Sequence, residues 1–169
     1  MVSDPRFSLV TTFPVTVPAR WYYHATALAT FKTDHFSDLA YLDCNLTDEN
    51  FVNVTKKLVP GHRFLVKVFQ IKEAVSSEDC LAFLRSQQAV LTGAQGLTLA
   101  YEQGKYQLPK GCRHLSFDKK KALWKDTGGS HRVPYAETNL TGGFGVCLDR
   151  FENDWGDGFC LLCFCDENE

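Results

Sequence analysis

The last apolar run of the chain, Gly158 to Cys165, constrains the fold more than any other segment. It reads G-F-C-L-L-C-F-C and has no polar residue before Asp166. A run this short, with Gly-Asp-Gly before it and Asp-Glu-Asn-Glu after it, is typical of a fully buried strand. Both faces of such a strand need cover from other segments. We therefore expect a sheet with helices packed against it.

Two earlier segments also have the pattern of strands. Residues 7 to 17 alternate between two faces, and Pro14 has no backbone N–H to donate, so we expect this strand at a sheet edge. His62 to Ile71 is the strongest strand after the last one and is expected in the interior of the sheet. Further short strands, separated by Gly- and Asp-containing turns, are expected at 113–117, 122–125, 131–135, 144–148 and 159–165.

Several segments have helical spacing or capping residues. Thr47 can cap a helix that ends at Pro60-Gly61, and Ser76 with Asp79 has the form of a capping box. The helices are expected at 25–31, 47–58, 77–88 and 93–103. The sequence therefore predicts a single α+β domain over residues 1–169, with an antiparallel or mixed sheet and two or three short helices. Residues 1–60 would supply an edge strand and a helix, and residues 62–165 the strand–helix–helix–strands core.

Composition limits the classes of partner and the compartment. The chain has 18 Lys and Arg against 20 Asp and Glu, so nucleic acid is not expected as a partner. No segment approaches the ~18 apolar residues of a membrane span, and no membrane partner is expected. Seven cysteines and an N-terminus without the pattern of a signal peptide favour a cytoplasmic protein with free thiols. No phosphate-binding glycine loop or His-Glu-x-x-His motif occurs, so no cofactor is expected.

Four cysteines near the C-terminus suggest a zinc site as one alternative. They are Cys147, Cys160, Cys163 and Cys165. A structural Cys-x-x-Cys pair lies on a turn, where both thiolates converge on one ion. Here Leu161 and Leu162 separate the cysteines inside a predicted strand, and alternation places Cys160 on the face opposite Cys163 and Cys165. Packing as small apolar side chains is therefore the favoured interpretation, and no metal is expected.

An acidic loop between 149 and 157 is a weak alternative metal site. It carries Asp149, Glu152, Asp154 and Asp157, and calcium takes six to eight oxygen ligands from such a segment. The spacing differs from that of an EF-hand loop. A solvated acidic loop leading into the last strand is the favoured interpretation. Trp155, in the same loop, is either an anchor folded back onto the core or a residue presented to a partner.

One basic and aromatic cluster suggests a single-stranded nucleic-acid binder as an alternative function. Lys119-Lys120-Lys121 precede Trp124, and a hairpin turning at Gly128-Gly129 would bring His131 and Arg132 to the same face. Bases stack on aromatic rings while cations follow the phosphates. A solvated turn with a half-buried Trp124 explains the same residues and is favoured at this charge density.

Cys112 and His114 suggest a thiol-dependent enzyme as another alternative. They lie two residues apart on a predicted strand and so share a face, where they could form a thiolate–imidazolium pair. The sequence supplies no orienting third group and no oxyanion hole. We therefore expect no catalytic residue and leave this pair as the alternative.

The order of the elements over residues 62–165 resembles the C-type-lectin-like fold. A strand, two helices and a series of short strands follow one another, and the final F-C-L-L-C-F-C resembles the closing strand of that fold, which pairs beside the first. The sequence lacks the Glu-Pro-Asn motif of the sugar-binding members, and Asn153-Asp154-Trp155 only permutes their Trp-Asn-Asp. The resemblance therefore implies recognition of a protein or another ligand through the loops before the last strands.

These observations predict a small cytoplasmic, non-catalytic binding module. Aromatic and charged residues gather in its C-terminal, Gly-rich loops, and loops on a rigid scaffold are where binding residues concentrate. A protein is the expected partner, and the oligomeric state is open. The expected ligand-binding residues are Trp124, His131, Arg132, Asp154, Trp155 and Asp157.

Overall fold

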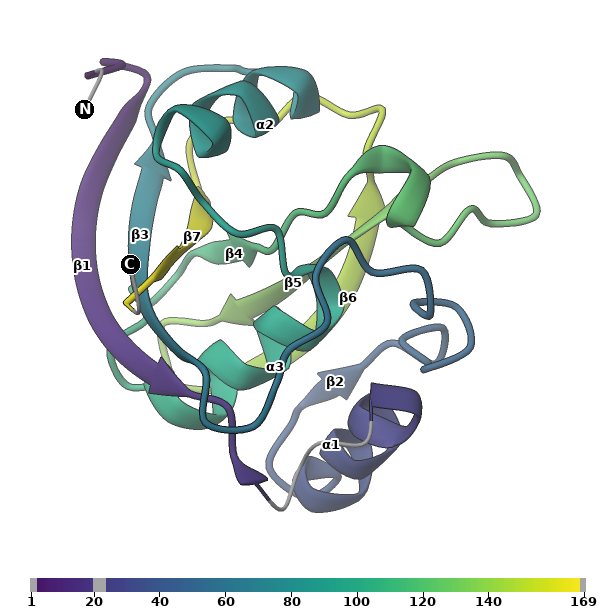
Figure 1. The fold of residues 1–169 in the computed structure, drawn as a ribbon. Helices are drawn as coiled ribbons and strands as arrows, with labels where there is room; N and C mark the ends of the chain where they lie inside the picture. The colour runs from purple at the N-terminus through teal and green to yellow at the C-terminus, as the bar shows by residue number, and fades with distance from the viewer. Residues whose placement is uncertain (1–2, 20–23, 168–169) are drawn as a thin grey trace.

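The structure, a computed structural model, describes residues 3–19 and 24–167 and has an α+β fold (Figure 1). About 23% of the chain is helix and 32% is strand. In the described residues the strands are β1 (Phe7–Thr16), β2 (Tyr41–Leu42), β3 (Arg63–Ile71), β4 (Arg113–Leu115), β5 (Arg132–Thr138), β6 (Phe144–Arg150) and β7 (Phe159–Asp166). The helices are α1 (Ala27–His35), α2 (Ser77–Ser86) and α3 (Gly93–Gly104), with short 3₁₀ segments η2 (His24–Thr26) and η3 (Lys120–Ala122).

All of these strands belong to one mixed sheet, in the order β1-β3-β7-β4-β5-β6-β2. The last apolar run forms β7, which pairs antiparallel with β3 and parallel with β4. The predicted strand at 7–17 forms β1 at one edge, and the strand at 62–71 forms β3 in the interior. These three assignments from the sequence are confirmed.

Helices cover both faces of the sheet (Figure 1). Cys160, Leu162 and Phe164 of β7 point into the core beneath α3, which α1 flanks. Leu161 and Cys163 point into the second core, beneath α2. The alternating pattern of β7 therefore contributes to two cores, and this explains why the run has no polar residue.

Two glycines let α3 approach the sheet closely. A side chain at Gly104 would overlap the ring of Phe13 in β1, and one at Gly96 would overlap Thr92 and meet the ring of Phe164 at 3.2 Å. Because neither position has room for a Cβ, the backbone of α3 packs directly on side chains of β1 and β7.

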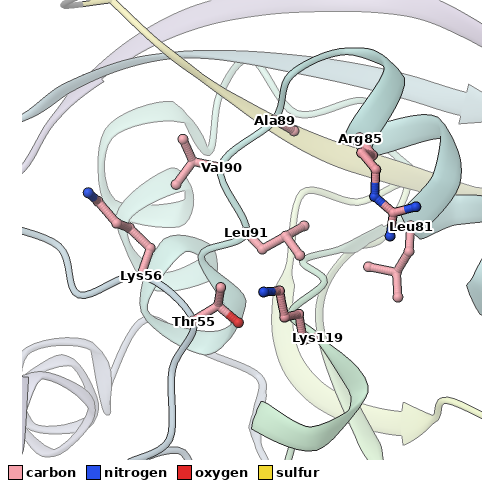
Figure 2. Close-up of a pocket in the computed structure, with 8 residues that line it drawn as sticks. All are labelled: Thr55, Lys56, Leu81, Arg85, Ala89, Val90, Leu91 and Lys119. Carbon is pink, nitrogen blue, oxygen red and sulfur yellow. The ribbon is translucent and has the colours of Figure 1, made fainter.

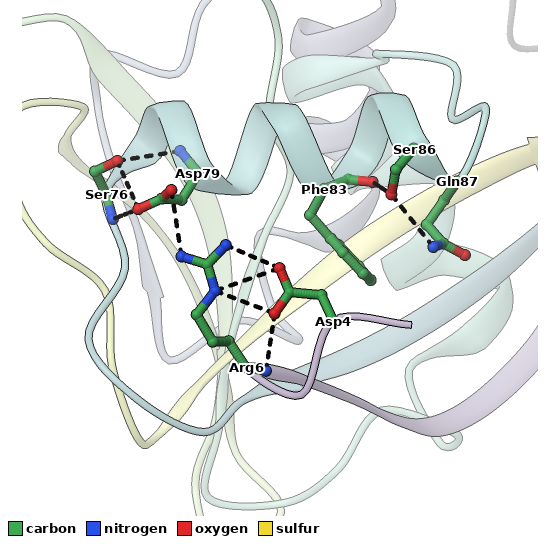
Figure 3. A network of polar contacts seen from close by, with 7 residues as sticks. All are labelled: Asp4, Arg6, Ser76, Asp79, Phe83, Ser86 and Gln87. Carbon is green, nitrogen blue, oxygen red and sulfur yellow. Dashed lines mark hydrogen bonds and ion pairs between the residues drawn. The ribbon is translucent and has the colours of Figure 1, made fainter. Parts of the chain in front are cut away.

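The N-terminal segment is tied to the start of α2 (Figure 3). Ser76 and Asp79 form the predicted capping box, in which the Asp79 backbone N–H donates to Ser76 Oγ at 3.1 Å and the Ser76 N–H to Asp79 Oδ2 at 3.1 Å. Arg6 bridges Asp4 at 2.8 Å and Asp79 at 3.3 Å. The capping box thus orders the first turn of α2, and the ion pair between Arg6 and Asp79 holds the residues before β1 next to it.

The prediction of a helix at 47–58 is wrong. Residues 47–51 form one hydrogen-bonded turn, and the chain then continues through bends to residue 62. The Asp48 carboxylate accepts from the Leu28 and Ala29 N–H groups at 2.8 and 3.0 Å, and so caps the first turn of α1 instead of its own segment. Tertiary capping of α1 therefore replaces the local helix.

Two further boundaries differ from the prediction. The segment at 122–125 is not a strand: Ala122 ends η3, and only Lys125 forms a bridge, to His131. The short helix expected at 25–31 runs as α1 from Ala27 to His35. Among the described residues no helix is long and apolar enough to cross a membrane.

Candidate functional site

A pocket of about 360 Å³ opens beside the C-terminal end of α2 (Figure 2). It combines basic side chains with an apolar lining. The residues around it are Thr55, Lys56, Leu81, Arg85, Ala89, Val90, Leu91 and Lys119. They come from the loop after α1 and β2, from α2, from the connection to α3, and from the segment after β4. We refer to this feature as the basic pocket.

Backbone hydrogen bonds hold the apolar wall of the basic pocket in place. The Val90 N–H donates to the Phe164 carbonyl of β7 at 2.8 Å, so the connection between α2 and α3 runs along the sheet as an isolated bridge. Leu81, Ala89 and Leu91 pack against the core beneath α2 and are only partly covered. The wall is therefore apolar, built on the sheet, and in contact with solvent.

Asp118 joins two loops at the edge of the pocket. Its Oδ2 accepts from the Thr55 N–H at 3.1 Å and its Oδ1 from the Lys119 N–H at 2.7 Å. Asp118 is buried, and this burial raises the pKa of its carboxyl group, while hydrogen bonds from Thr55 and Lys119 act in the opposite direction. Asp118 thus positions Thr55 and Lys119 next to each other although they are far apart in the sequence.

Lys56, Arg85 and Lys119 give the pocket a positive charge. None of the ion pairs between described residues involves any of the three. In Figure 2 the Arg85 guanidinium lies next to Leu81, and the Lys119 ammonium lies between Thr55 and Leu91, whereas Lys56 points away. An adjoining hollow of about 410 Å³ shares Thr55 and Lys119 and adds Lys121. The site can therefore hold an anionic group next to an apolar one.

Trp155, predicted as a ligand-binding residue, is instead a core anchor. It is 1% exposed, and its Nε1 donates to Ser77 Oγ at 2.7 Å in the first turn of α2. Ser77 Oγ in turn donates to the Phe151 carbonyl at 2.6 Å. Because the indole is enclosed and its N–H is satisfied, Trp155 has no surface to present to a partner. The sequence allowed two roles for Trp155, a core anchor or a residue presented to a partner, and the structure shows the core anchor.

Trp124, His131 and Arg132 come together in the predicted hairpin, but neighbouring groups satisfy them. Arg132 pairs with Asp126 at 2.5 Å, and His131 Nδ1 lies 3.0 Å from Glu152, which also meets Lys120 at 3.7 Å. Trp124 is half-buried against the core beneath α3. These contacts engage Arg132 and His131 within the hairpin, so the two side chains that were predicted to bind a ligand bind neighbouring carboxylates instead.

Asp154 and Asp157 lie exposed in the loop before β7 and do not build a calcium site. Asp149 instead accepts from Asn153 Nδ2 at 2.9 Å, and Glu152 faces His131. In the described part of the chain no group of three or more His, Cys, Asp or Glu side chains could hold a metal ion. For zinc, the alternation holds: Cys160 and Cys163 face different cores.

The Cys112–His114 alternative is not supported by the geometry. His114 is fully buried, and its Nε2 lies 3.1 Å from the Pro109 carbonyl, which makes Nε2 the protonated nitrogen. Burial lowers the pKa of His114 to about 4, so the imidazole is neutral at neutral pH. Cys112 is partly buried and packs against the core beneath α3, which also contains Cys160. A thiolate–imidazolium pair needs a charged imidazole, and His114 does not supply one.

The sequence already singled out Lys119 to Lys121, but it gave no signal for Arg85, Lys56 or the apolar wall as parts of one site. Comparison of the chain with protein families, curated proteins and solved structures finds no match. The pairing of β7 beside β3 agrees with what the C-type-lectin-like resemblance implies. With no matching structure, that resemblance stays a prediction.

Proposed function

We propose that the protein is a non-catalytic binding module that recognises an acidic segment of a protein partner at the basic pocket. The single observation that carries the proposal is the pair Arg85 and Lys119, which line one pocket together with apolar side chains and have no ion-pair partner among the described residues. The sequence predicted the partner-binding surface in the C-terminal loops, whereas the proposal places it at the basic pocket. Lys119, the first residue of the basic run Lys119 to Lys121, belongs to that pocket.

Charge complementarity favours carboxylates as the anionic groups. The chain has a net charge of −2, but Arg85 and Lys119 line one pocket without an ion-pair partner among the described residues, and this favours a local positive potential there. A guanidinium accepts a carboxylate bidentately, and an ammonium next to it takes a second one. The wall of Leu81 and Leu91 then offers room for an apolar side chain between two acidic residues.

The lining favours a protein over single-stranded nucleic acid. Proteins that bind single strands stack bases on aromatic rings, and the lining of the basic pocket contains no aromatic residue. Trp124, which the nucleic-acid alternative needs, packs against the core beneath α3. We extend the proposal to a cytoplasmic location, because all seven cysteines are free thiols and a reducing compartment preserves them.

Fluorescence anisotropy with short labelled peptides tests the proposal. The probe is a leucine flanked by Asp and Glu, and its matched control has Asn and Gln in their place. We expect the acidic peptide to bind more tightly, and its affinity to fall as salt is added, because the contacts are screened. Arg85→Glu and Lys119→Glu should each weaken binding about tenfold, which corresponds to about 1.4 kcal/mol.

Lys125→Glu is the matched control variant, because it makes the same charge change on the exposed hairpin. It should bind the acidic peptide as the unmodified protein does. Equal affinity for the acidic and the neutral peptide would contradict the proposal. Tighter binding of a single-stranded oligonucleotide than of the peptide would favour the nucleic-acid alternative, and loss of binding only in Lys125→Glu would return the site to the hairpin.

A further inference from the structure

The two cysteines at the end of β7 form a close thiol pair. Cys163 Sγ and Cys165 Sγ are 3.8 Å apart, on the face of β7 that points toward α2. Cys163 is fully buried, whereas Cys165 is only partly covered. A small oxidant can therefore reach Cys165 from solvent, and the thiol of Cys163 lies next to Cys165 on its buried side.

Lys67 places a positive charge at this pair. It lies opposite Cys163 in the register of β3 and β7, so the side chains of Lys67 and Cys163 share a face of the sheet with that of Cys165. A hydrogen bond from Cys163 and the charge of Lys67 lower the pKa of Cys165, and the same hydrogen bond together with burial raises the pKa of Cys163. Cys165 is thus the thiolate of the pair and Cys163 the protonated partner.

We propose that Cys163 and Cys165 are a modification site at which a hydroperoxide oxidises the pair to an intramolecular disulfide. The Cys165 thiolate attacks one oxygen of hydrogen peroxide, the O–O bond breaks, and hydroxide leaves as Cys165 becomes a sulfenic acid. The sulfur of Cys163 then attacks the sulfur of Cys165, the S–O bond breaks, and water leaves with the proton of Cys163. In sum, the two sulfurs lose two electrons and the peroxide gains them. One water forms in the second step, and the hydroxide of the first step becomes the second water by taking up the proton that Cys165 released on ionisation.

The strand geometry allows the second bond. Residues two apart on a strand have Cα atoms about 6.6 Å apart, at a rise of about 3.3 Å per residue. Disulfides have Cα separations of about 4.4 to 6.8 Å, so the pair falls at the long end of the accepted range. A disulfide at this limit is more easily reduced than an ideal one, so the modification is reversible by cellular dithiols.

Peptide mapping of the full chain tests the proposal. No Lys or Arg follows Arg150, so trypsin releases Cys160, Cys163 and Cys165 in one peptide. The reduced protein is treated with hydrogen peroxide, the remaining thiols are blocked with N-ethylmaleimide, and the peptide is analysed by mass spectrometry. We expect one label in place of three, located on Cys160, and full recovery of three labels after dithiothreitol.

Variants assign the two roles. In Cys163→Ala the sulfenic acid has no resolving thiol, so dimedone should trap it on Cys165; in Cys165→Ala neither the disulfide nor the dimedone adduct should form. Cys44→Ala is the matched control, because Cys44 is exposed and lies in a loop, and it should leave the disulfide intact. Far-UV circular dichroism verifies that each variant is folded.

Three outcomes would overturn the proposal. One is a peptide that keeps all three labels while Cys44 is oxidised. Another is a disulfide between Cys112 and Cys160, the other pair of neighbouring thiols. The third is dimedone labelling that is unchanged in Cys165→Ala. Each assigns the reactivity to a thiol other than Cys165, and none depends on the proposed peptide binding.

Discussion

Replacing Trp155 with alanine should destabilise the protein and leave the proposed binding site unchanged. The indole is 1% exposed and meets the rings of Phe117 and Phe159 with centroids 6.0 and 5.2 Å away. Truncating a buried Trp or Phe to alanine costs about 3 to 5 kcal/mol. Ser77 Oγ keeps its bond to the Phe151 carbonyl, so the lost indole hydrogen bond adds little to this cost.

The expected loss of unfolding free energy in Trp155→Ala is large enough to measure by thermal and urea unfolding. A loss of about 4 kcal/mol corresponds to a fall in melting temperature of roughly 8 to 16 °C for a chain of this length. Urea unfolding followed by far-UV circular dichroism measures the free energy directly. Trp124→Ala is the control, since its half-buried ring should cost clearly less.

The opposite result would refute the anchor role. If Trp155→Ala unfolds within about 1 kcal/mol of the unmodified protein and loses peptide binding, the indole acts at the surface, as one reading of the sequence predicted. If it is destabilised and the folded fraction binds peptide normally, the structural account holds.

Three further predictions follow from the cap, the buried histidine and β7. Ser76→Ala should lower the free energy of unfolding by about 1 kcal/mol in urea unfolding, because the Asp79 N–H loses its acceptor, and an unchanged value would contradict the capping role. His114 has a folded pKa of about 4, below its value of 6.5 in the unfolded chain, so the unfolded state binds the extra proton and stability falls as pH drops from 6.5 to 4. The loss is up to roughly 3 kcal/mol, and His114→Gln should remove that part of the pH dependence; an identical slope would refute it. Closing a disulfide around Phe164 should weaken its bridge to Val90, so hydrogen exchange at the Val90 N–H should speed up on oxidation, and unchanged exchange would show that the bridge survives.

Local patterns were sufficient for the elements whose contacts are local or repetitive. The apolar run of β7, the alternation in β1 and β3, and the Ser76–Asp79 capping box each depend on residues within one segment. The segment after Thr47 misled because Thr47 does cap a turn there, with its Oγ1 accepting from the Asn50 N–H at 3.1 Å, but the turn does not continue as a helix and Asp48 binds the backbone of α1. A residue that caps a distant helix cannot be recognised from the sequence around it, because its partner lies in another segment.

The candidate site was predictable only in part, because it is formed by segments that are distant in the sequence. Lys119 to Lys121 stand out as a run of charge, but Arg85 is an ordinary cation in the last turn of α2. The two meet because the Val90 bridge and the Asp118–Thr55 hydrogen bond fold separate segments against each other. Trp155 shows the converse, since a large aromatic in an acidic loop gives the same pattern whether it is buried or presented.

The most direct test of the basic pocket is a nuclear magnetic resonance titration of the isotope-labelled protein with the acidic, leucine-containing peptide. If the account is correct, the backbone amide signals of Val90, Leu91 and Lys119 move together and saturate at one stoichiometric equivalent, while those of Ser130 and Asp157 stay in place. Shifts centred on Ser130 and Asp157, with the signals of Val90 to Leu91 unmoved, would contradict the pocket and assign binding to the C-terminal loops.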